Sequence, residues 1–241
     1  MIQLFKIFKD LENFIFPPLC MICNNELKKR EVICQRCFDK VYFISSKKCK
    51  FCGRPIKNGK TCKFCRRERP SFDFLISSGN YVFPFSEIIK IYKYKNRPVL
   101  SSKLARKLYS SYLAHSHLGK IDYLTWVPMR RAETRERGYN QSELLAKEFA
   151  KISSLKCVEL LYKASNIPSQ TKLPEEKRIN NVKEAYKIKE KELKKLKLEK
   201  GKSIIIIDDV LTTGSTLNEC AKKLKEVGFK KVYGLVLAIS P

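Results

Sequence analysis

Residues 203–217 read Ser-Ile-Ile-Ile-Ile-Asp-Asp-Val-Leu-Thr-Thr-Gly-Ser-Thr-Leu, and this stretch decides the fold predicted for the whole chain. The run Ile204–Ile207 is apolar without a break, which is typical of a strand buried on both faces of a sheet. Asp208 and Asp209 stand where we expect that strand to end, and a small, hydroxyl-rich segment follows them. Apolar residues then recur with helical spacing up to Gly228, a residue type that commonly ends helices. The stretch therefore predicts a strand, an acidic pair, a loop and a helix.

The loop between this strand and this helix has the chemistry of a phosphate site. A helix N-terminus offers free backbone N–H groups and the positive end of the helix dipole. Gly214 lets the backbone approach an anion closely. The two acids would repel a phosphate, but they can accept hydrogen bonds from sugar hydroxyls or help to hold a divalent cation. A phosphorylated sugar meets both demands, whereas the plain alternative is a buried strand with an acidic edge and an ordinary helix cap. The hydroxyl donors are Thr212, Thr213, Ser215 and Thr216.

The segment Ile204–Thr216 resembles the phosphoribosyl pyrophosphate motif of type I phosphoribosyltransferases. That motif runs from an apolar stretch through two acids and two apolar residues to Thr-Thr-Gly-x-Thr. It is not a Walker A sequence, because no Gly-Lys-Ser/Thr follows. The resemblance implies that Asp208 and Asp209 bind the ribose hydroxyls and that Thr212–Thr216 cradles the 5′-phosphate. It also implies Mg²⁺ as a cofactor and an α/β fold in which helices flank a parallel sheet.

Eight of the ten cysteines form four Cys-x2-Cys pairs, a spacing that predicts zinc knuckles in a reducing compartment. A tight turn lets two thiolates reach one ion, and a second turn completes the tetrahedron. Pairing consecutive knuckles gives two zinc ribbons, although alternate knuckles could also pair in a cross-braced arrangement. No coordination position stays open, so we expect two structural zinc ions. The expected ligands are Cys20, Cys23, Cys34, Cys37, Cys49, Cys52, Cys62 and Cys65.

The chain of 241 residues carries a formal net charge of +26, which attracts polyanions through a salt-sensitive field. Lysine-rich composition also arises in other ways, so the charge alone predicts no nucleic-acid site. Residues 1–16 are apolar on one side but are interrupted by charges, which favours a helix docked on the protein over a membrane-surface anchor. No secretory signal or long apolar stretch is present, so we expect a cytoplasmic protein without stable membrane insertion.

Elsewhere the pattern alternates between strands and helices, which predicts a mainly parallel sheet with ligands bound at the carboxyl ends of its strands. Residues 133–141 are charged and contain glycine, so we expect a mobile loop there. The lysine-rich insert 183–202 is expected to form an exposed helix. The expected strands are 72–82, 122–127 and 231–239, and the expected helices begin near Pro84, Pro98 and Leu144.

The order of these features resembles the ComF family, which carries a double zinc ribbon before a phosphoribosyltransferase-like domain. The resemblance rests on the knuckles, on Tyr92–Lys95, on Val127–Arg131, on Arg135-x-Arg137-Gly138-Tyr139-Asn140-Gln141 and on the motif at 204–216. The segment 169–173 with Arg178 and Asn181 also fits the pattern. The resemblance implies that Arg130 and Arg131 lie by the pyrophosphate, and that Arg135, Arg137 and Asn140 belong to the loop that closes on it.

The sequence therefore predicts an N-terminal amphipathic helix at 1–16, a double zinc ribbon at 17–69 and a phosphoribosyltransferase-like domain at 70–241. The implied activity is Mg²⁺-dependent transfer of a phosphoribosyl group, a pentosyltransferase reaction, to an unknown acceptor. The family resemblance links such proteins to DNA uptake in natural competence, with single-stranded DNA and the competence machinery as candidate partners. The alternative is a non-catalytic, DNA-binding competence factor that uses the same fold as a ligand sensor.

Overall fold

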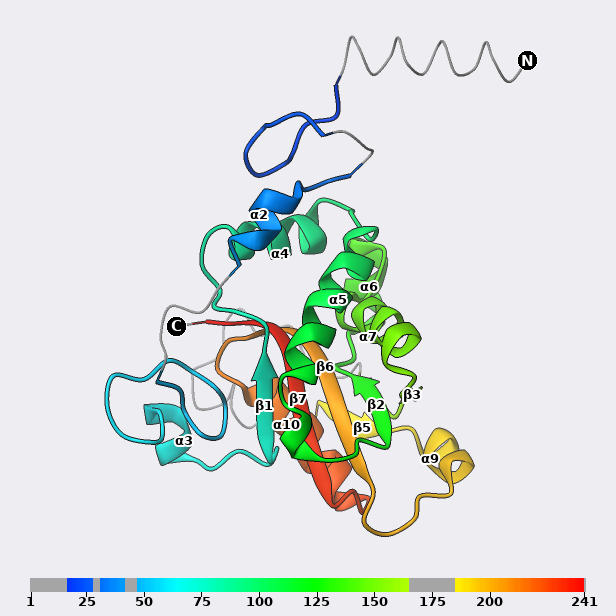
Figure 1. The fold of residues 1–241 in the computed structure, drawn as a ribbon. Helices are drawn as coiled ribbons and strands as arrows, with labels where there is room; N and C mark the ends of the chain where they lie inside the picture. The colour runs from blue at the N-terminus through cyan, green and yellow to red at the C-terminus, as the bar shows by residue number, and fades with distance from the viewer. Residues whose placement is uncertain (1–16, 28–30, 42–46, 165–184, 241) are drawn as a thin grey trace, which may run out of the picture.

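The computed structural model describes residues 17–27, 31–41, 47–164 and 185–240. Five parallel strands form one sheet with the order β1-β7-β6-β2-β3, which confirms the predicted fold class (Figure 1). The helix predicted at 1–16 and the family segment at 169–173 with Arg178 and Asn181 lie outside the described residues. The sheet strands are β1 (Phe74–Ser77), β2 (Tyr123–Trp126), β3 (Lys156–Cys157), β6 (Ser203–Leu211) and β7 (Lys231–Ile239).

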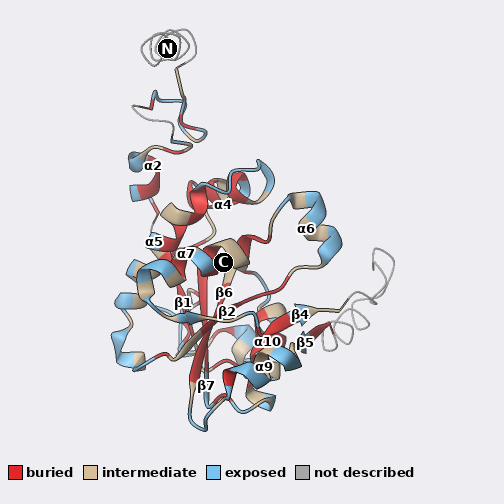
Figure 2. Cartoon of the chain, turned by 90° about the vertical axis from the view of Figure 1, so that its right-hand side faces the viewer, coloured by how far each residue is buried: buried red, intermediate tan, exposed pale blue. Residues whose placement is uncertain are grey.

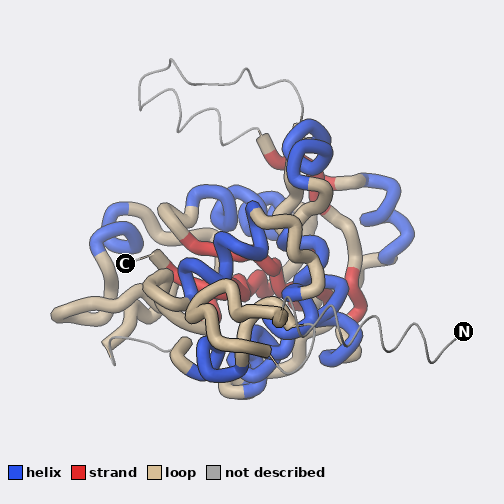
Figure 3. Tube along the Cα trace, turned by 90° about the horizontal axis from the view of Figure 1, so that it is seen from above, coloured by secondary structure: helices blue, strands red, loops and turns tan. Residues whose placement is uncertain are grey.

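Strand β6 lies at the centre of the sheet, and its isoleucines supply both layers of the core. Ile205 and Ile207 pack with α4 (Phe85–Tyr94), α5 (Leu100–Leu113) and α7 (Gln141–Ser153). Ile204 and Ile206 pack with α10 (Ser215–Glu226) on the other face, because successive side chains of a strand point to opposite sides. The strands form a central layer between helices when seen from above (Figure 3), and they are buried (Figure 2).

The connections from two neighbouring strands leave the sheet on opposite sides. Helix α7 follows β2 and covers one face, whereas α10 follows β6 directly and covers the other. Strands β2 and β6 are parallel partners, with Tyr123 opposite Ile204 and Trp126 opposite Ile207. Their carboxyl ends therefore meet at a topological switch point, the place where open parallel sheets bind ligands. The loops that part there carry the predicted arginines and the predicted phosphate cradle.

Two local predictions were wrong, and neighbouring structure explains both. Strand β6 does not end at the acids but runs to Leu211, because β7 pairs with it as far as Leu211 opposite Ile239. The expected mobile loop at 133–141 is occupied mostly by α6 (Arg131–Arg137). Its start is fixed by a capping box in which Glu133 accepts a hydrogen bond from the Arg130 backbone, and Gly138 ends it in a left-handed conformation.

The remaining elements lie outside the main sheet. The lysine-rich insert includes the predicted exposed helix α9 (Glu190–Leu196), but it also contributes a strand that the sequence pattern did not reveal. That strand, β5 (Tyr186–Ile188), pairs antiparallel with β4 (Leu161–Lys163). Among the residues that the structure describes, none of the helices combines the length and hydropathy that a membrane-spanning segment needs. The short helices are α2 (Gln35–Asp39), α3 (Lys63–Arg67) and the 3₁₀ turn η1 (Ser116–Leu118).

Candidate functional site

The eight paired cysteines form two four-thiol clusters of consecutive knuckles, and within each cluster the sulfurs lie within 4.8 Å of one another. The Sγ atoms of Cys20 and Cys37 are 3.9 Å apart, and those of Cys23 and Cys34 are 3.7 Å apart. A tetrahedral zinc ion with Zn–S bonds of about 2.3 Å requires sulfurs about 3.8 Å apart. The clusters therefore fit structural zinc, in the sequential rather than the cross-braced pairing. The ligand sets are Cys20, Cys23, Cys34 and Cys37, and Cys49, Cys52, Cys62 and Cys65.

The two clusters belong to different layers of the protein core. Cys20 and Cys37 of the first ribbon are buried in the layer that contains α4 and α5. Cys49 and Cys52 of the second ribbon are buried in the layer that contains α10. Figure 1 shows the first ribbon near α4 and α2, and the second ribbon with α3 beside the edge strand β1. Each zinc site therefore stabilises the core layer on a different face of the sheet.

The predicted acids lie at the carboxyl end of β6, and both are engaged by other elements. The Asp209 carboxylate is 2.7 Å from the Lys93 ammonium, and the two side chains are only 13% and 16% exposed. Asp208 accepts hydrogen bonds from the Ser142 hydroxyl at 2.8 Å and from the Asp209 backbone at 2.9 Å. Lys93 comes from the last turn of α4 and Ser142 from the first turn of α7. The acidic pair is thus the point where three elements converge.

The environment of this pair perturbs its protonation. Burial, with a further contribution from the neighbouring Asp209, raises the pKa of Asp208 to about 7. Burial also acts to lower the pKa of Lys93, but the ion pair with Asp209 outweighs it and raises that pKa. Ionisation of Asp208 is therefore costly in the free protein. Groups that donate hydrogen bonds to the pair, such as the hydroxyls of a sugar, would relieve that cost.

The predicted phosphate cradle is an exposed turn that opens α10. Gly214 is the N-cap residue of α10, with a φ of 89° that side-chain-bearing residues rarely adopt. The Thr213 and Ser215 hydroxyls are 2.9 Å apart, and the Ser215 backbone donates to Thr213 Oγ1 at 3.3 Å. Burial raises the pKa of Tyr186 of β5, and the neighbouring Thr216 side chain acts in the opposite direction. Backbone N–H groups at the start of a long helix, with hydroxyls beside them, suit a phosphate.

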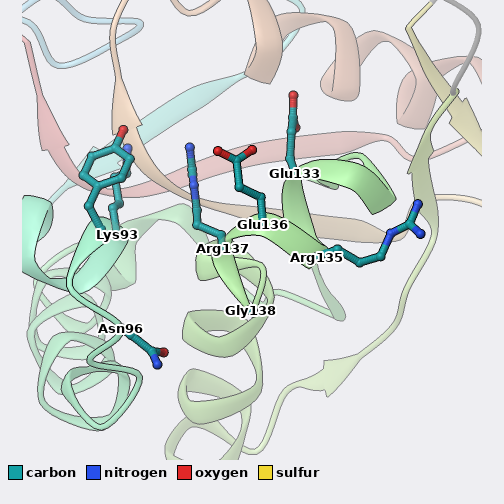
Figure 4. Close-up of a pocket in the computed structure, with 8 residues that line it drawn as sticks. Lys93, Asn96, Glu133, Arg135, Glu136, Arg137 and Gly138 are labelled. Atoms are coloured by element: carbon teal, nitrogen blue, oxygen red, sulfur yellow. The ribbon is translucent and has the colours of Figure 1, made fainter.

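A pocket of about 450 Å³ lies between the end of α4 and helix α6 (Figure 4). Arg137 stacks on the Tyr94 ring at 5.0 Å and donates to the Gln141 side chain at 3.2 Å. Arg135 points away from Arg137, as expected for residues two positions apart on a helix. The two arginines therefore do not converge on one point. The residues that line the pocket are Lys93, Tyr94, Asn96, Glu133, Arg135, Glu136, Arg137 and Gly138.

The other residues predicted for the pyrophosphate have partners of their own. Arg130 forms a 2.6 Å ion pair with Glu133, which is also 3.7 Å from Lys163 of β4. Arg131 is exposed at the start of α6. Asn140 is buried and acts as the N-cap of α7, where it accepts from the Ser142 backbone at 3.0 Å and donates to the Val127 carbonyl at 3.2 Å. Asn140 thus positions a helix, and it is not part of a mobile loop.

Lys93 and Ser142 are site residues that the sequence did not single out. Lys93 lies in the segment Tyr92–Lys95, which fits the family pattern, but nothing local shows that its partner is Asp209. Two tyrosines fix the end of α4 against α7, since Tyr92 donates to the Gln141 carbonyl at 2.9 Å and Tyr139 donates to the Tyr92 carbonyl. This clamp determines where Lys93 stands relative to the acidic pair.

Comparison with known proteins agrees with both parts of the structure. The model of the double zinc ribbon domain matches residues 11–66, and the model of the phosphoribosyl transferase domain matches residues 144–239. The chain is 28% identical to competence protein F of Haemophilus influenzae, over 91% of this chain and 96% of that protein. It is also 28% identical to the DNA utilization protein YhgH of Escherichia coli, over 88% and 92%. A crystal structure of adenine phosphoribosyltransferase aligns with 62% of this chain and 74% of its own, at 18% identity and a TM-score of 0.39.

The two thiol clusters predict the zinc content and its kinetics. Elemental analysis of the purified protein should find two zinc ions per chain. A chromogenic chelator should remove them in two phases, because Cys23 of the first ribbon is exposed whereas Cys49, Cys52 and Cys62 of the second are buried. Cys23→Ser should abolish the fast phase alone. A single zinc ion per chain, or one common phase of release, would contradict two separate sites.

The raised pKa of Asp208 predicts how stability depends on pH. The protonated form is favoured in the folded state, so its stabilisation is complete below about pH 4 and is lost as pH rises through about 7. Between pH 5 and pH 8 the wild type should lose roughly 2–3 kcal/mol of unfolding free energy relative to Asp208→Asn. Denaturant titrations at several pH values measure this difference.

Asp122→Asn is the matched control. Burial opposes ionisation of Asp122, but hydrogen bonds from Ser203 outweigh it and lower its pKa, so this carboxylate stays ionised across the same range. The control should therefore change stability by a similar amount at pH 5 and at pH 8. Parallel pH profiles for the wild type and Asp208→Asn would show that Asp208 ionises freely in the folded protein.

Proposed function

This chain belongs to the ComF family, and from that premise we propose that it binds phosphoribosyl pyrophosphate and transfers the phosphoribosyl group to an acceptor. One observation carries the proposal: an acidic pair near the carboxyl end of β6 is followed, two residues later, by a hydroxyl-rich turn that opens α10. Hydrogen-bond acceptors for a diol are thereby followed by N–H and hydroxyl donors for a phosphate. A ribose 5-phosphate group has both functions, because it carries a diol and a phosphate.

In this proposal the 5′-phosphate binds at Thr212–Thr216, and the ribose hydroxyls donate to Asp208 and Asp209. The sugar replaces Lys93 as the partner of Asp209, since both compete for the same carboxylate. Lys93 already lines the pocket that contains Arg137, so once released it can face the pyrophosphate. Ligand binding would thus exchange an internal ion pair for contacts with both ends of the substrate. This exchange supports recognition of the whole ligand.

The transfer breaks the bond between C1 of the ribose and the pyrophosphate oxygen, and the departing pyrophosphate keeps the electron pair. An acceptor nucleophile then forms the new bond at C1. Lys93 and Arg137 would offset the negative charge that grows on the leaving group, while the acids hold the sugar and stabilise its developing positive charge. The paired carboxylates offer oxygen donors of the kind that suit Mg²⁺, which would add positive charge beside the pyrophosphate when bound.

A second candidate function is binding of single-stranded DNA by a competence factor that senses phosphoribosyl pyrophosphate without turning it over. The formal net charge of +26 favours contact with a polyanion, and relatives carry the names competence protein and DNA utilization protein. Release of pyrophosphate in the presence of pooled acceptors separates the two functions. Turnover supports the transferase, whereas ligand binding without turnover and with salt-sensitive DNA binding supports the sensor.

Replacement of both acids tests the sugar site. The double variant Asp208→Asn with Asp209→Asn keeps the side-chain shapes but removes both carboxylates as hydrogen-bond acceptors for the ribose diol. Hydrogen bonds to charged groups contribute roughly 1.5–3 kcal/mol each, so affinity for phosphoribosyl pyrophosphate should fall about tenfold or more. Calorimetry measures the affinity, and circular dichroism checks that the variant is folded. Unchanged affinity in a folded double variant would exclude the acids as the sugar site.

The arginines of α6 provide a test of the pyrophosphate side. Arg137→Ala should weaken phosphoribosyl pyrophosphate about fivefold to tenfold and leave ribose 5-phosphate nearly unchanged, because only the former carries a pyrophosphate. Arg135→Ala is the matched control from the same helix and the same pocket, and it should have less than about a third of that effect because the Arg135 side chain points away from that of Arg137 (Figure 4). Equal losses for the two ligands in Arg137→Ala would place Arg137 at the 5′-phosphate instead.

A further inference from the structure

Arg54 of the second zinc ribbon contacts the phosphate loop from outside the proposed binding site. Its side chain is only 5% exposed, and its guanidinium donates a hydrogen bond to the backbone carbonyl of Thr212, 158 residues further along the chain. A buried cation is costly unless it has well-placed partners. Neither the ribbon nor the sugar site described above explains why an arginine is buried at this position. The partner that it has is the first residue of the loop at 212–216.

Both knuckles of the second zinc site hold Arg54 in place. In the first knuckle, the Cys49 backbone donates to the Arg54 carbonyl at 2.8 Å, and the Gly53 backbone donates to the Cys49 carbonyl at 2.9 Å. In the second knuckle, Phe64 stands between Cys62 and Cys65, and the Arg54 guanidinium lies 4.4 Å from the centre of its ring. A cation over an aromatic ring is favourable and keeps the guanidinium plane oriented.

The contact holds a backbone carbonyl of the loop, on the side of the peptide opposite to the N–H groups that would face a bound anion. When backbone N–H groups of a turn point at an anion, the carbonyls of the same peptides point in other directions and need partners of their own. The Leu211 carbonyl accepts from the Ser240 backbone at 2.9 Å, and the next carbonyl, that of Thr212, accepts from Arg54. Two successive carbonyls are thus held just before Gly214, where the chain turns into α10.

We propose that Arg54 is a positioning residue for the phosphate loop, and that the second zinc ribbon serves the binding of ribose 5-phosphate groups by holding this side chain. The proposal rests on the proposed function, since it assigns a role toward the same 5′-phosphate. Arg54 acts through the Thr212 peptide and does not touch the ligand. It thereby links a structural zinc site to the affinity of the neighbouring loop for an anion.

Attachment of the ribbon to the sheet does not depend on Arg54. The Leu75 backbone of β1 donates to the Phe51 carbonyl at 3.0 Å, and the Ser71 backbone, just after the ribbon, donates to the Asn218 side chain of α10 at 2.5 Å. Cys49, Cys52 and Cys62 are buried in the same core layer as α10. Removal of the Arg54 side chain should therefore leave the ribbon folded and docked while it frees the Thr212 peptide. This separation makes the proposal testable.

The experiment compares Arg54→Ala, Arg54→Lys, Phe64→Leu and Arg66→Ala in the zinc-loaded chain of 241 residues. Arg66 is an exposed arginine of α3 in the same ribbon and serves as the matched control. Calorimetry measures affinity for ribose 5-phosphate and for inorganic pyrophosphate, hydrogen exchange reports the amides of 212–216, and elemental analysis gives the zinc content.

We expect Arg54→Ala to lose about tenfold in affinity for ribose 5-phosphate, to change by less than about twofold for pyrophosphate and to retain two zinc ions. Exchange of the loop amides should rise at least tenfold in this variant. Arg54→Lys should recover part of the affinity, since lysine keeps a donor but not the planar fork over the ring. Phe64→Leu, which removes the ring and keeps the zinc ligands, should lose about threefold. Arg66→Ala should behave as the wild type.

Wild-type affinity and wild-type exchange of the loop in Arg54→Ala would overturn the proposal. Loss of one zinc ion in that variant would also overturn it, because the loop would then follow unfolding of the ribbon. If the wild-type protein binds no ribose 5-phosphate but Arg54→Ala still increases exchange at 212–216, the proposed function fails while the positioning role of Arg54 stands.

Discussion

The burial of β6 on both faces is the constraint on which the rest of the structure depends. Ile204–Ile207 are fully buried, so the strand can reach solvent only at its carboxyl end. The two acids and the turn at 212–216 are the groups that stand at that end. Asp208 follows this run and is half-buried, and the loss of solvent around its carboxylate raises its pKa, so the packing that fixes the site also gives it unusual chemistry. Burial at β6 therefore accounts both for the packing of the sheet and for the raised pKa of Asp208.

In the free protein, the acidic and basic side chains of the site form ion pairs with one another, so the site does not present a row of like charges. Asp209 is paired with Lys93, and Glu133 lies between Arg130 and Lys163. Partly buried pairs of this kind cost desolvation free energy that their attraction must offset, and the balance changes when a partner leaves. A charged ligand that provides alternative partners can therefore rearrange the site without exposing an unpaired group. The tyrosine clamp between α4 and α7 holds the backbone at the end of α4, from which the Lys93 side chain extends.

Local patterns of sequence predicted much of the fold and only part of the site. The isoleucine run, the helical spacing after Gly214 and the cysteine pairs each depend on neighbouring residues, and the parallel sheet and both thiol clusters were predicted from them. The end of β6 was misplaced because pairing with β7, and not the polarity of the acids, keeps the strand extended. Helix α6 was missed because its charged composition concealed a capping box. Lys93 and Arg54 could not be recognised, since their partners lie far away in the sequence.

The position of the second zinc ribbon against the C-terminal part of the sheet affects the order in which the protein can fold during synthesis. Gly53 lies against Ile239, so that a Cβ at Gly53 would be 3.4 Å from the Ile239 side chain, and Arg54 reaches Thr212. The cysteines leave the ribosome early, whereas the surface that receives them is translated last. Closing a loop of that length is entropically costly, and non-local contacts form late. The ribbon can bind its metal while the chain is still being translated, but it can dock only after the final strand has been made.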